Sequence, residues 1–254
     1  MKNNSFRFIV ILLFLIIIFS PILNSSFNNT KTTESIKKDE SHLIDYTSDS
    51  DIINLAILES KPDGSIDITT KEIIYGEYRS LLYEITSKIS KTKTDDKPFL
   101  TIFNLLREKN LIKQNITINE IFGDKVSNFY NTTAYNLSIM EPFVSMFVPI
   151  IAAGMGFGGG IGDKFGSITG LLYSGGIIGL GAVLCFDALM KTIYVQFTFT
   201  FPLLLHIFAS FVGIMMFPVD FDFISTNFLP LFIYSNFIAI GYSALAIGFP
   251  LGYY

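Results

Sequence analysis

The chain has no tryptophan, two histidines and a single cysteine among its 254 residues. The lone thiol, Cys185, excludes an intrachain disulfide and a thiolate zinc cluster. Lysine and arginine total 18 against 22 acidic residues, so the basic excess typical of nucleic-acid-binding proteins is missing. No catalytic triad, P-loop, zinc helix or Rossmann fingerprint occurs. We therefore expect no nucleic-acid partner, no metal and no cofactor.

Charged residues are also scarce, at 16% of the chain against the ~25% of an ordinary soluble protein. Residues 24–141 hold most of them, as a balanced mixture of acids and bases. Residues 142–254 hold few, in three small clusters: Asp163 and Lys164, Asp187 and Lys191, and Asp220 and Asp222. These clusters divide the C-terminal region into apolar runs that each approach the ~20 residues with which an α-helix crosses a bilayer core.

The apolar runs predict a fold of the membrane all-α class. They cover about residues 143–161, 165–186, 193–217 and 228–251, with short connections between them. Short connections favour antiparallel neighbours. We therefore expect residues 142–254 to form a four-helix transmembrane domain.

Residues 1–23 have the pattern of a targeting or anchoring segment. Two basic residues precede an apolar run over residues 8–19, which fits either a signal peptide or a transmembrane anchor. Both alternatives place the next part of the chain outside the cytoplasm, because the positive charge stays inside. Residues 24–50 are polar and predict a flexible linker, followed by a small extracytoplasmic α+β module at residues 51–141.

The predicted module begins with a hairpin and a helix. Residues 52–58 are apolar enough for a strand, residues 61–64 read Lys-Pro-Asp-Gly and signal a turn, and residues 65–70 predict a returning strand. A capping box at residues 69–72 opens a predicted helix that runs to about Ser90. Its apolar stripe, which we expect to face the core, consists of Ile74, Tyr78, Leu81, Leu82, Ile85 and Ile89. Two further helices are predicted, one over residues 99–110 and one over residues 119–140.

Residues 24–141, the linker and the module together, also carry an excess of N-x-[ST] sequons. Composition alone is one explanation, and N-glycosylation of an extracellular surface is the other. The acceptor asparagines are Asn24, Asn28, Asn115, Asn131 and Asn136.

Glycines recur at intervals of four in the first two apolar runs. On a transmembrane helix such spacing lets two backbones approach closely, so it predicts tight packing of the first two helices. An unwound segment of the kind found in transporters is the alternative. The glycines concerned are Gly154, Gly156, Gly158, Gly160, Gly162, Gly166, Gly170, Gly175 and Gly179.

The first glycine tract ends in Gly-Ile-Gly-Asp at residues 160–163. This G-x-G-D sequence resembles the motif of intramembrane aspartyl proteases of the presenilin and prepilin-peptidase kind. The resemblance implies that Asp163 is one of two catalytic carboxylates that share a proton. The chain departs from the pattern, because the preceding apolar run contains no acid and no Pro-Ala-Leu sequence follows.

Three residues form a possible intramembrane polar site: Asp163, His206 and Asn236. Ionisable groups at membrane depth are candidates for function, although a neutral histidine can also bond to a neighbouring helix. A relay would need a carboxylate at similar depth. The pair Asp220 and Asp222, and His42 with its acidic neighbours, more readily form solvated segments than cation sites.

The sequence thus predicts a non-catalytic multipass membrane protein that displays an extracytoplasmic interaction domain. It would serve in a cell-envelope assembly, in adhesion or in sensing. Its expected partners are the lipid bilayer, and membrane or envelope proteins or further copies of itself. The alternatives are an oligomeric transporter or channel subunit and an intramembrane aspartyl protease-like hydrolase.

Overall fold

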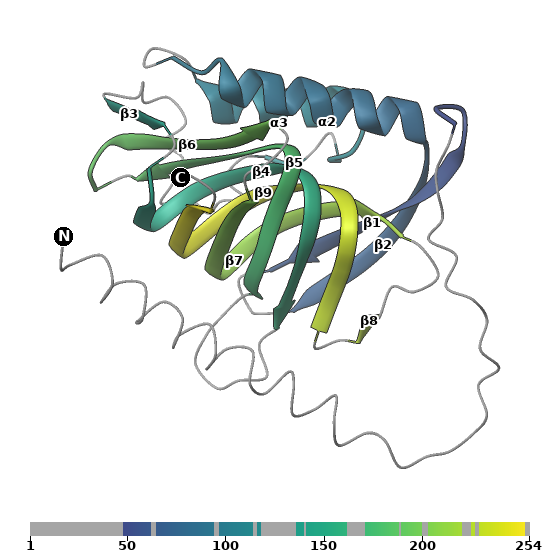
Figure 1. Cartoon of the computed structure of the whole chain (residues 1–254). Helices are drawn as coiled ribbons and strands as arrows, with labels where there is room; N and C mark the ends of the chain where they lie inside the picture. Colours follow the sequence, from purple (N-terminus) through teal and green to yellow (C-terminus); the bar gives the residue numbers. More distant parts are fainter. Residues whose placement is uncertain are drawn as a thin grey trace. The chain divides into compact units, whose positions relative to one another are not determined.

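The computed structural model describes residues 48–61, 65–93, 97–113, 116–117, 136–139, 141–161, 171–187, 189–199, 203–219, 225–226 and 229–251. All of them belong to one compact unit, Tyr46–Tyr254. In this part of the chain a mainly antiparallel sheet packs against two helices (Figure 1). The strands follow the order β2-β1-β7-β9-β4-β5-β6-β3, and β8 pairs with β9.

The elements alternate little between helix and strand. The part of the chain before residue 142 contains β1 (Ile52–Ser60), β2 (Ile66–Ile74), α2 (Tyr75–Ser90), α3 (Pro98–Glu108) and β3 (Asn136–Ile139). The C-terminal half contains β4 (Phe143–Ile161), β5 (Leu171–Asp187), β6 (Thr192–Phe199), β7 (Leu203–Pro218), β8 (Ser225–Thr226) and β9 (Leu229–Leu251).

The predicted four-helix transmembrane domain is wrong. Each apolar run forms strands: β4, β5, β6 with β7, and β9. Across the described ranges, no helix combines the length and the apolar character needed to span a bilayer. The membrane all-α class is therefore overturned, and so are the multipass location, the external placement of residues 24–141, and the display, transport and hydrolase functions that assumed membrane helices.

The reason lies in burial on both sides of the sheet. A strand with one solvent-exposed face alternates between apolar and polar residues, whereas a strand buried on both faces is apolar throughout. The second half of β5, from Gly181 to Asp187, is buried at every position. Such a run cannot be distinguished from an apolar helix by periodicity.

The predicted hairpin and the first two helices of the module are confirmed. β1 and β2 pair antiparallel from Ile52 opposite Ile74 to Ser60 opposite Ile66. Helix α2 begins later than predicted, because residues 69–74 continue β2 and its N-cap residue, Ile74, makes no side-chain capping bond. Helix α3 begins at Pro98, where the missing N–H costs nothing.

The remaining boundary predictions have mixed outcomes. Residues 136–139 form β3, so the end of the predicted helix at residues 119–140 is a strand, and residues 118–135 lie outside the described residues. The predicted targeting segment at residues 1–23 and most of the linker at residues 24–50 also lie outside the described residues.

Two apolar cores lie on opposite faces of the sheet. The first lies under the helices and joins Tyr78, Ile85 and Phe103 to strand residues such as Ile214 and Ile240. The second lies on the inner face and includes Phe143, Tyr173, Phe208, Phe211 and Phe237. Because β1 pairs with β7, residues from both halves of the chain build one sheet.

The sheet turns back on itself at one end. Strand β5 pairs with β4 and also with β7, and β7 connects through β9 to β4. Figure 1 shows these four strands curving together below the helix layer. This closure encloses the second core.

Candidate functional site

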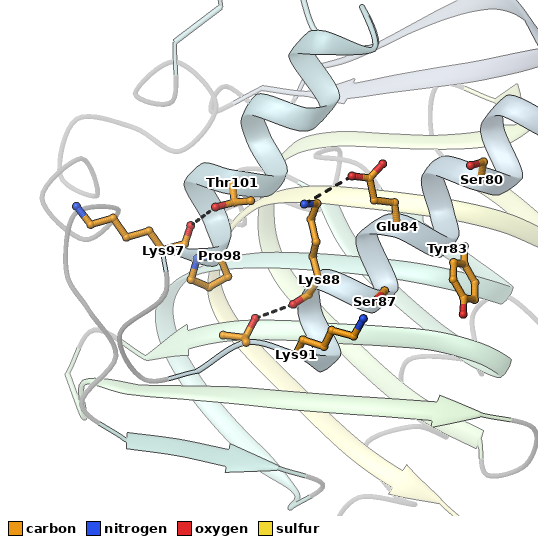
Figure 2. Close-up of a pocket in the computed structure, with 10 residues that line it drawn as sticks. Ser80, Tyr83, Glu84, Ser87, Lys88, Lys91, Lys97, Pro98 and Thr101 are labelled. Carbon is orange, nitrogen blue, oxygen red and sulfur yellow. Dashed lines mark hydrogen bonds and ion pairs between the residues drawn. The ribbon is translucent and has the colours of Figure 1, made fainter.

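A surface groove lies between the outer side of α2 and the start of α3 (Figure 2). Its volume is about 620 Å³, within the range of small-molecule sites. It is lined by Ser80, Tyr83, Glu84, Ser87, Lys88, Lys91, Thr92, Lys97, Pro98 and Thr101.

The amphipathic pattern of α2 creates one wall of this groove. Residues three or four apart share a face of a helix. The apolar residues of α2 face the sheet, where Tyr78, Leu81, Leu82, Ile85 and Ile89 are buried. The opposite face therefore presents the hydroxyl and charged side chains that line the groove.

Lysines outnumber the acids along the described lining. Lys88, Lys91 and Lys97 lie there with one carboxylate, Glu84. The ammonium of Lys88 is 3.6 Å from Glu84 Oε1, in a half-exposed ion pair one helical turn apart. Figure 2 shows Lys91 extending along α2 toward Tyr83, whereas Lys97 extends away from α2. Two cations thus face the groove, and a third stands at its edge on a long flexible side chain.

The lysines are not needed to cap α2. The carbonyl of Ser87 accepts hydrogen bonds from Lys91 N at 3.2 Å and from Ser90 Oγ at 3.1 Å. The carbonyl of Lys88 accepts one from Thr92 Oγ1 at 3.0 Å. Carbonyls at a helix C-terminus otherwise attract basic side chains. Because local donors satisfy these carbonyls, α2 needs neither ammonium group as a cap; the ammonium of Lys88 is shared with Glu84, and Lys91 extends along the groove wall (Figure 2).

His206, a predicted polar-site residue, lies in the inner core. Its side chain is fully buried, and neither ring nitrogen has a hydrogen-bond partner within the described part of the chain. Burial lowers the pKa of His206 to about 3. The imidazole is therefore neutral near pH 7.

The structure does not bring His206 and Asn236 together. Asn236 Nδ2 donates a hydrogen bond to Tyr75 Oη at 3.1 Å, on the helix-covered face. His206 contacts aromatic rings of the inner core, including Phe208 at 4.9 Å between centroids. Asp163 lies outside the described residues.

The described recurrent glycines lie in strands, and all of them except Gly179 serve close strand contacts, which corrects the helix-packing prediction. Gly154, Gly156, Gly158 and Gly160 lie in β4, and Gly175 and Gly179 in β5; Gly162, Gly166 and Gly170 lie outside the described residues. At Gly156 an added Cβ would lie 1.9 Å from the carbonyl oxygen of Gly176 on the neighbouring strand. Only glycine allows this approach.

The predicted glycosylation acceptors are not tested by the described part of the chain. Asn24, Asn28, Asn115 and Asn131 lie outside the described residues, and Asn136 begins β3. Where the chain is described, no three His, Cys, Asp or Glu side chains gather as metal ligands. Burial raises the pKa of the Cys185 thiol, which opposes formation of a reactive thiolate.

Sequence reasoning missed the groove. The polar positions of α2 could be found from its helical spacing, which places Ser80, Glu84, Ser87, Lys88 and Lys91 on one side. The position of α3 relative to them is a tertiary contact and leaves no local signal.

Comparison with protein-family models, curated proteins and solved structures finds no match to this chain.

Proposed function

We propose that the domain binds a small phosphate-bearing ligand in the groove between α2 and α3. The observation that carries the proposal is the excess of lysines over acids along the described lining. Lysine is a common phosphate ligand, because its ammonium is a compact charge with three donors on a flexible stem.

Neutral groups in the groove complement the lysines. Ser80 and Ser87 supply hydroxyl donors from the same face of α2. Tyr83 is 63% exposed and belongs to the same lining as Lys91, so its ring offers a flat apolar surface to an organic group (Figure 2). This arrangement suits a phosphate ester better than a bare ion.

Binding is proposed without catalysis. Within the described lining the single carboxylate, Glu84, is paired with Lys88, and the lining has no histidine or cysteine. Exposed charge pairs contribute only ~0–1 kcal/mol each. The affinity should therefore be modest and should fall as salt screens the lysines.

Titration with inorganic pyrophosphate, followed by NMR chemical shifts at low salt, tests the proposal. The double variant Lys88→Ala and Lys91→Ala should bind about tenfold more weakly than the natural chain, equal to about 1.4 kcal/mol. Lys109→Ala with Lys113→Ala is the matched control, because both lysines are exposed and line no part of the described groove. Equal weakening in both double variants would indicate a general charge effect and contradict the groove.

A further inference from the structure

Strand β2 forms one margin of the sheet. The strand order begins with it, and among the described strands its single neighbour is β1 (Figure 1). It pairs with β1 along its whole length, from Ile66 opposite Ser60 to Ile74 opposite Ile52, in unbroken register. The other side of β2 therefore presents an uninterrupted row of backbone N–H and C=O groups that no described strand pairs.

Edge strands of natural proteins usually carry features that prevent further pairing. Short length, proline, bulges and charged side chains are the common ones. β2 has nine residues, no proline and no bulge, and six of the nine are β-branched, which favours a strand. Charge is the one protective feature left, in Asp67, Lys71 and Glu72. The positions of these charges therefore decide which chain can pair with this edge.

The charges of β2 complement one another in a single antiparallel register. A two-fold axis at Thr69 places Asp67 opposite Lys71 of the partner subunit, and Lys71 opposite Asp67 of the partner subunit. The two copies of Thr69 then face each other. Opposite charges directly across two strands stabilise their pairing, and so do paired threonines. One register thus forms two ion pairs and a threonine pair at once.

Other registers lose these pairs. Successive side chains of a strand point to opposite faces, so the axis of a two-fold strand pair must pass through a residue. Moving the axis from Thr69 by one residue in either direction leaves Asp67 and Lys71 opposite neutral residues. Moving it by two residues brings the two copies of Asp67, or of Lys71, together. The charges therefore specify the register as well as the partner.

A lysine from outside would also offset a like-charge contact within the sheet. Asp67 lies directly opposite Glu59 of β1, an arrangement that destabilises strand pairing. Lys61 already forms an ion pair with Asp67, and a second ammonium on the open side of β2 would balance the two acids with two cations. Lys71 Nζ donates a hydrogen bond to the carbonyl oxygen of Asn110 at 2.8 Å. An ammonium has three hydrogens, so the same group can also bond a carboxylate.

We propose that two copies of this chain join through their β2 strands in an antiparallel, two-fold dimer centred on Thr69. The two sheets become one continuous sheet across the pair. Main-chain hydrogen bonds supply the affinity, and the two ion pairs select a second copy over a foreign strand. A foreign strand would have to offer a base and an acid at matching positions, whereas another β2 does so by symmetry. The proposal is independent of the groove, which is lined by α2, α3 and the segment between them.

The dimer should be weak and sensitive to salt. A single pair of strands buries less surface than a standard protein–protein interface, and salt screens exposed charges. We therefore expect monomer and dimer to exchange at micromolar to millimolar concentrations, with a dimer fraction that falls as salt is added.

Sedimentation equilibrium of the full chain, at low salt and several concentrations, tests the dimer. The natural chain should change from monomer to dimer as its concentration rises. Asp67→Lys should raise the dimer dissociation constant about 30-fold, because lysines then face each other in both pairs. Lys71→Asp should do the same by opposing carboxylates. A thermal unfolding curve shows that each variant folds.

A mixture of the two variants tests the register. The Asp67→Lys chain carries lysine at both positions and the Lys71→Asp chain carries aspartate at both, so one copy of each restores two opposite-charge pairs. An equimolar mixture should dimerise at concentrations where each variant alone is monomeric. A chain with both substitutions should recover the natural dissociation constant.

Glu77→Lys is the matched control. Glu77 is an exposed acid in the first turn of α2, so this variant changes the net charge as Asp67→Lys does. It should dimerise as the natural chain does. The proposal is overturned by a natural chain that stays monomeric, by single variants that dimerise normally, by a mixture that stays monomeric, or by equal weakening in the control. Pyrophosphate binding is a separate readout, since loss of the dimer should leave it unchanged.

Discussion

The imidazole of His206 stacks on the phenol ring of Tyr173, with 5.3 Å between the ring centroids. Both side chains are buried in the closed end of the sheet. Phe208 and Phe237 complete the aromatic surroundings of the histidine. A titratable base therefore lies among aromatic rings, and neither of its nitrogens has a hydrogen-bond partner in the described part of the chain.

This environment makes the free energy of unfolding depend on pH. The folded-state pKa of His206 is about 3, below its ordinary value of 6.5. A base with a lowered pKa takes up a proton more readily in the unfolded chain, so its contribution to stability is complete above pH 6.5 and is lost progressively as the pH falls toward 3. His206→Phe should remove that loss, which is on the order of several kcal/mol.

Urea unfolding at several pH values between 4 and 8 measures the effect. The natural chain and His206→Phe should differ in stability by an amount that grows as the pH falls below about 6.5. The carboxylates titrate equally in both proteins, so the difference isolates the histidine. Parallel pH profiles would show that the imidazole of the folded protein accepts protons normally.

Gly156→Ala should destabilise the sheet severely. The added Cβ would lie 1.9 Å from the carbonyl oxygen of Gly176, and backbone atoms cannot rotate away. We expect a loss of about 3 kcal/mol or more in the free energy of unfolding, measured by denaturant titration. Ser174→Ala, which removes an atom from a partly exposed position on the facing strand, should cost less than about 0.5 kcal/mol. If Gly156→Ala loses as little stability as Ser174→Ala, the two strands lie farther apart than described.

Tyr78→Phe should loosen the attachment of α2 to the sheet. The hydroxyl of Tyr78 lies 3.1 Å from the carbonyl oxygen of Met216 and 3.2 Å from that of Asn236, on two neighbouring strands. Removing this buried donor takes a hydrogen bond from these carbonyls, at a cost of about 1–3 kcal/mol. Tyr83→Phe removes the hydroxyl of an exposed tyrosine on the same helix and should change the thermal midpoint little. If Tyr78→Phe leaves the thermal midpoint unchanged, water replaces the hydroxyl as the donor.

Glu84→Gln should strengthen anion binding. The carboxylate holds the ammonium of Lys88 and repels an anion in the groove. Its neutralisation should raise pyrophosphate affinity by about two- to fivefold at low ionic strength, and the gain should shrink as salt is added. Glu77→Gln, on the exposed first turn of the same helix, provides the charge-matched comparison. Unchanged affinity in Glu84→Gln would place the anion elsewhere.

Local patterns identified the polar half of the fold. The turn at residues 61–64, the alternating strand after it and the apolar stripe of α2 each depend on nearby residues, and the structure has β1, β2 and α2 close to where these patterns predict them. Pro98 marked the start of α3 for the same reason. Ile74 is not part of the buried stripe of α2 as predicted, because β2 extends through it and its side chain is 42% exposed.

The apolar half could not be assigned from length and hydropathy. A run such as residues 229–251 is long enough for a bilayer helix, yet it forms one strand with neighbours on both sides. What identifies it is pairing with distant residues, for example Ile240 opposite Ile151. The close approach at Gly156 likewise served strands, although glycine at intervals of four suggested helices. The groove depended on the position of α3 against α2, which no local pattern specifies.

The pairing of β1 with β7 also bears on how the chain folds during synthesis. Ser60 Oγ donates a hydrogen bond to the carbonyl of Phe211, across 151 positions of sequence. Contacts of such long separation slow folding, because the intervening chain must be confined before they form. The β1–β2 hairpin can form early, but its neighbour β7 is synthesised much later. The pairing of β1 with β7 can therefore form only after β7 has left the ribosome, and until then the apolar edge of β1 needs protection from aggregation.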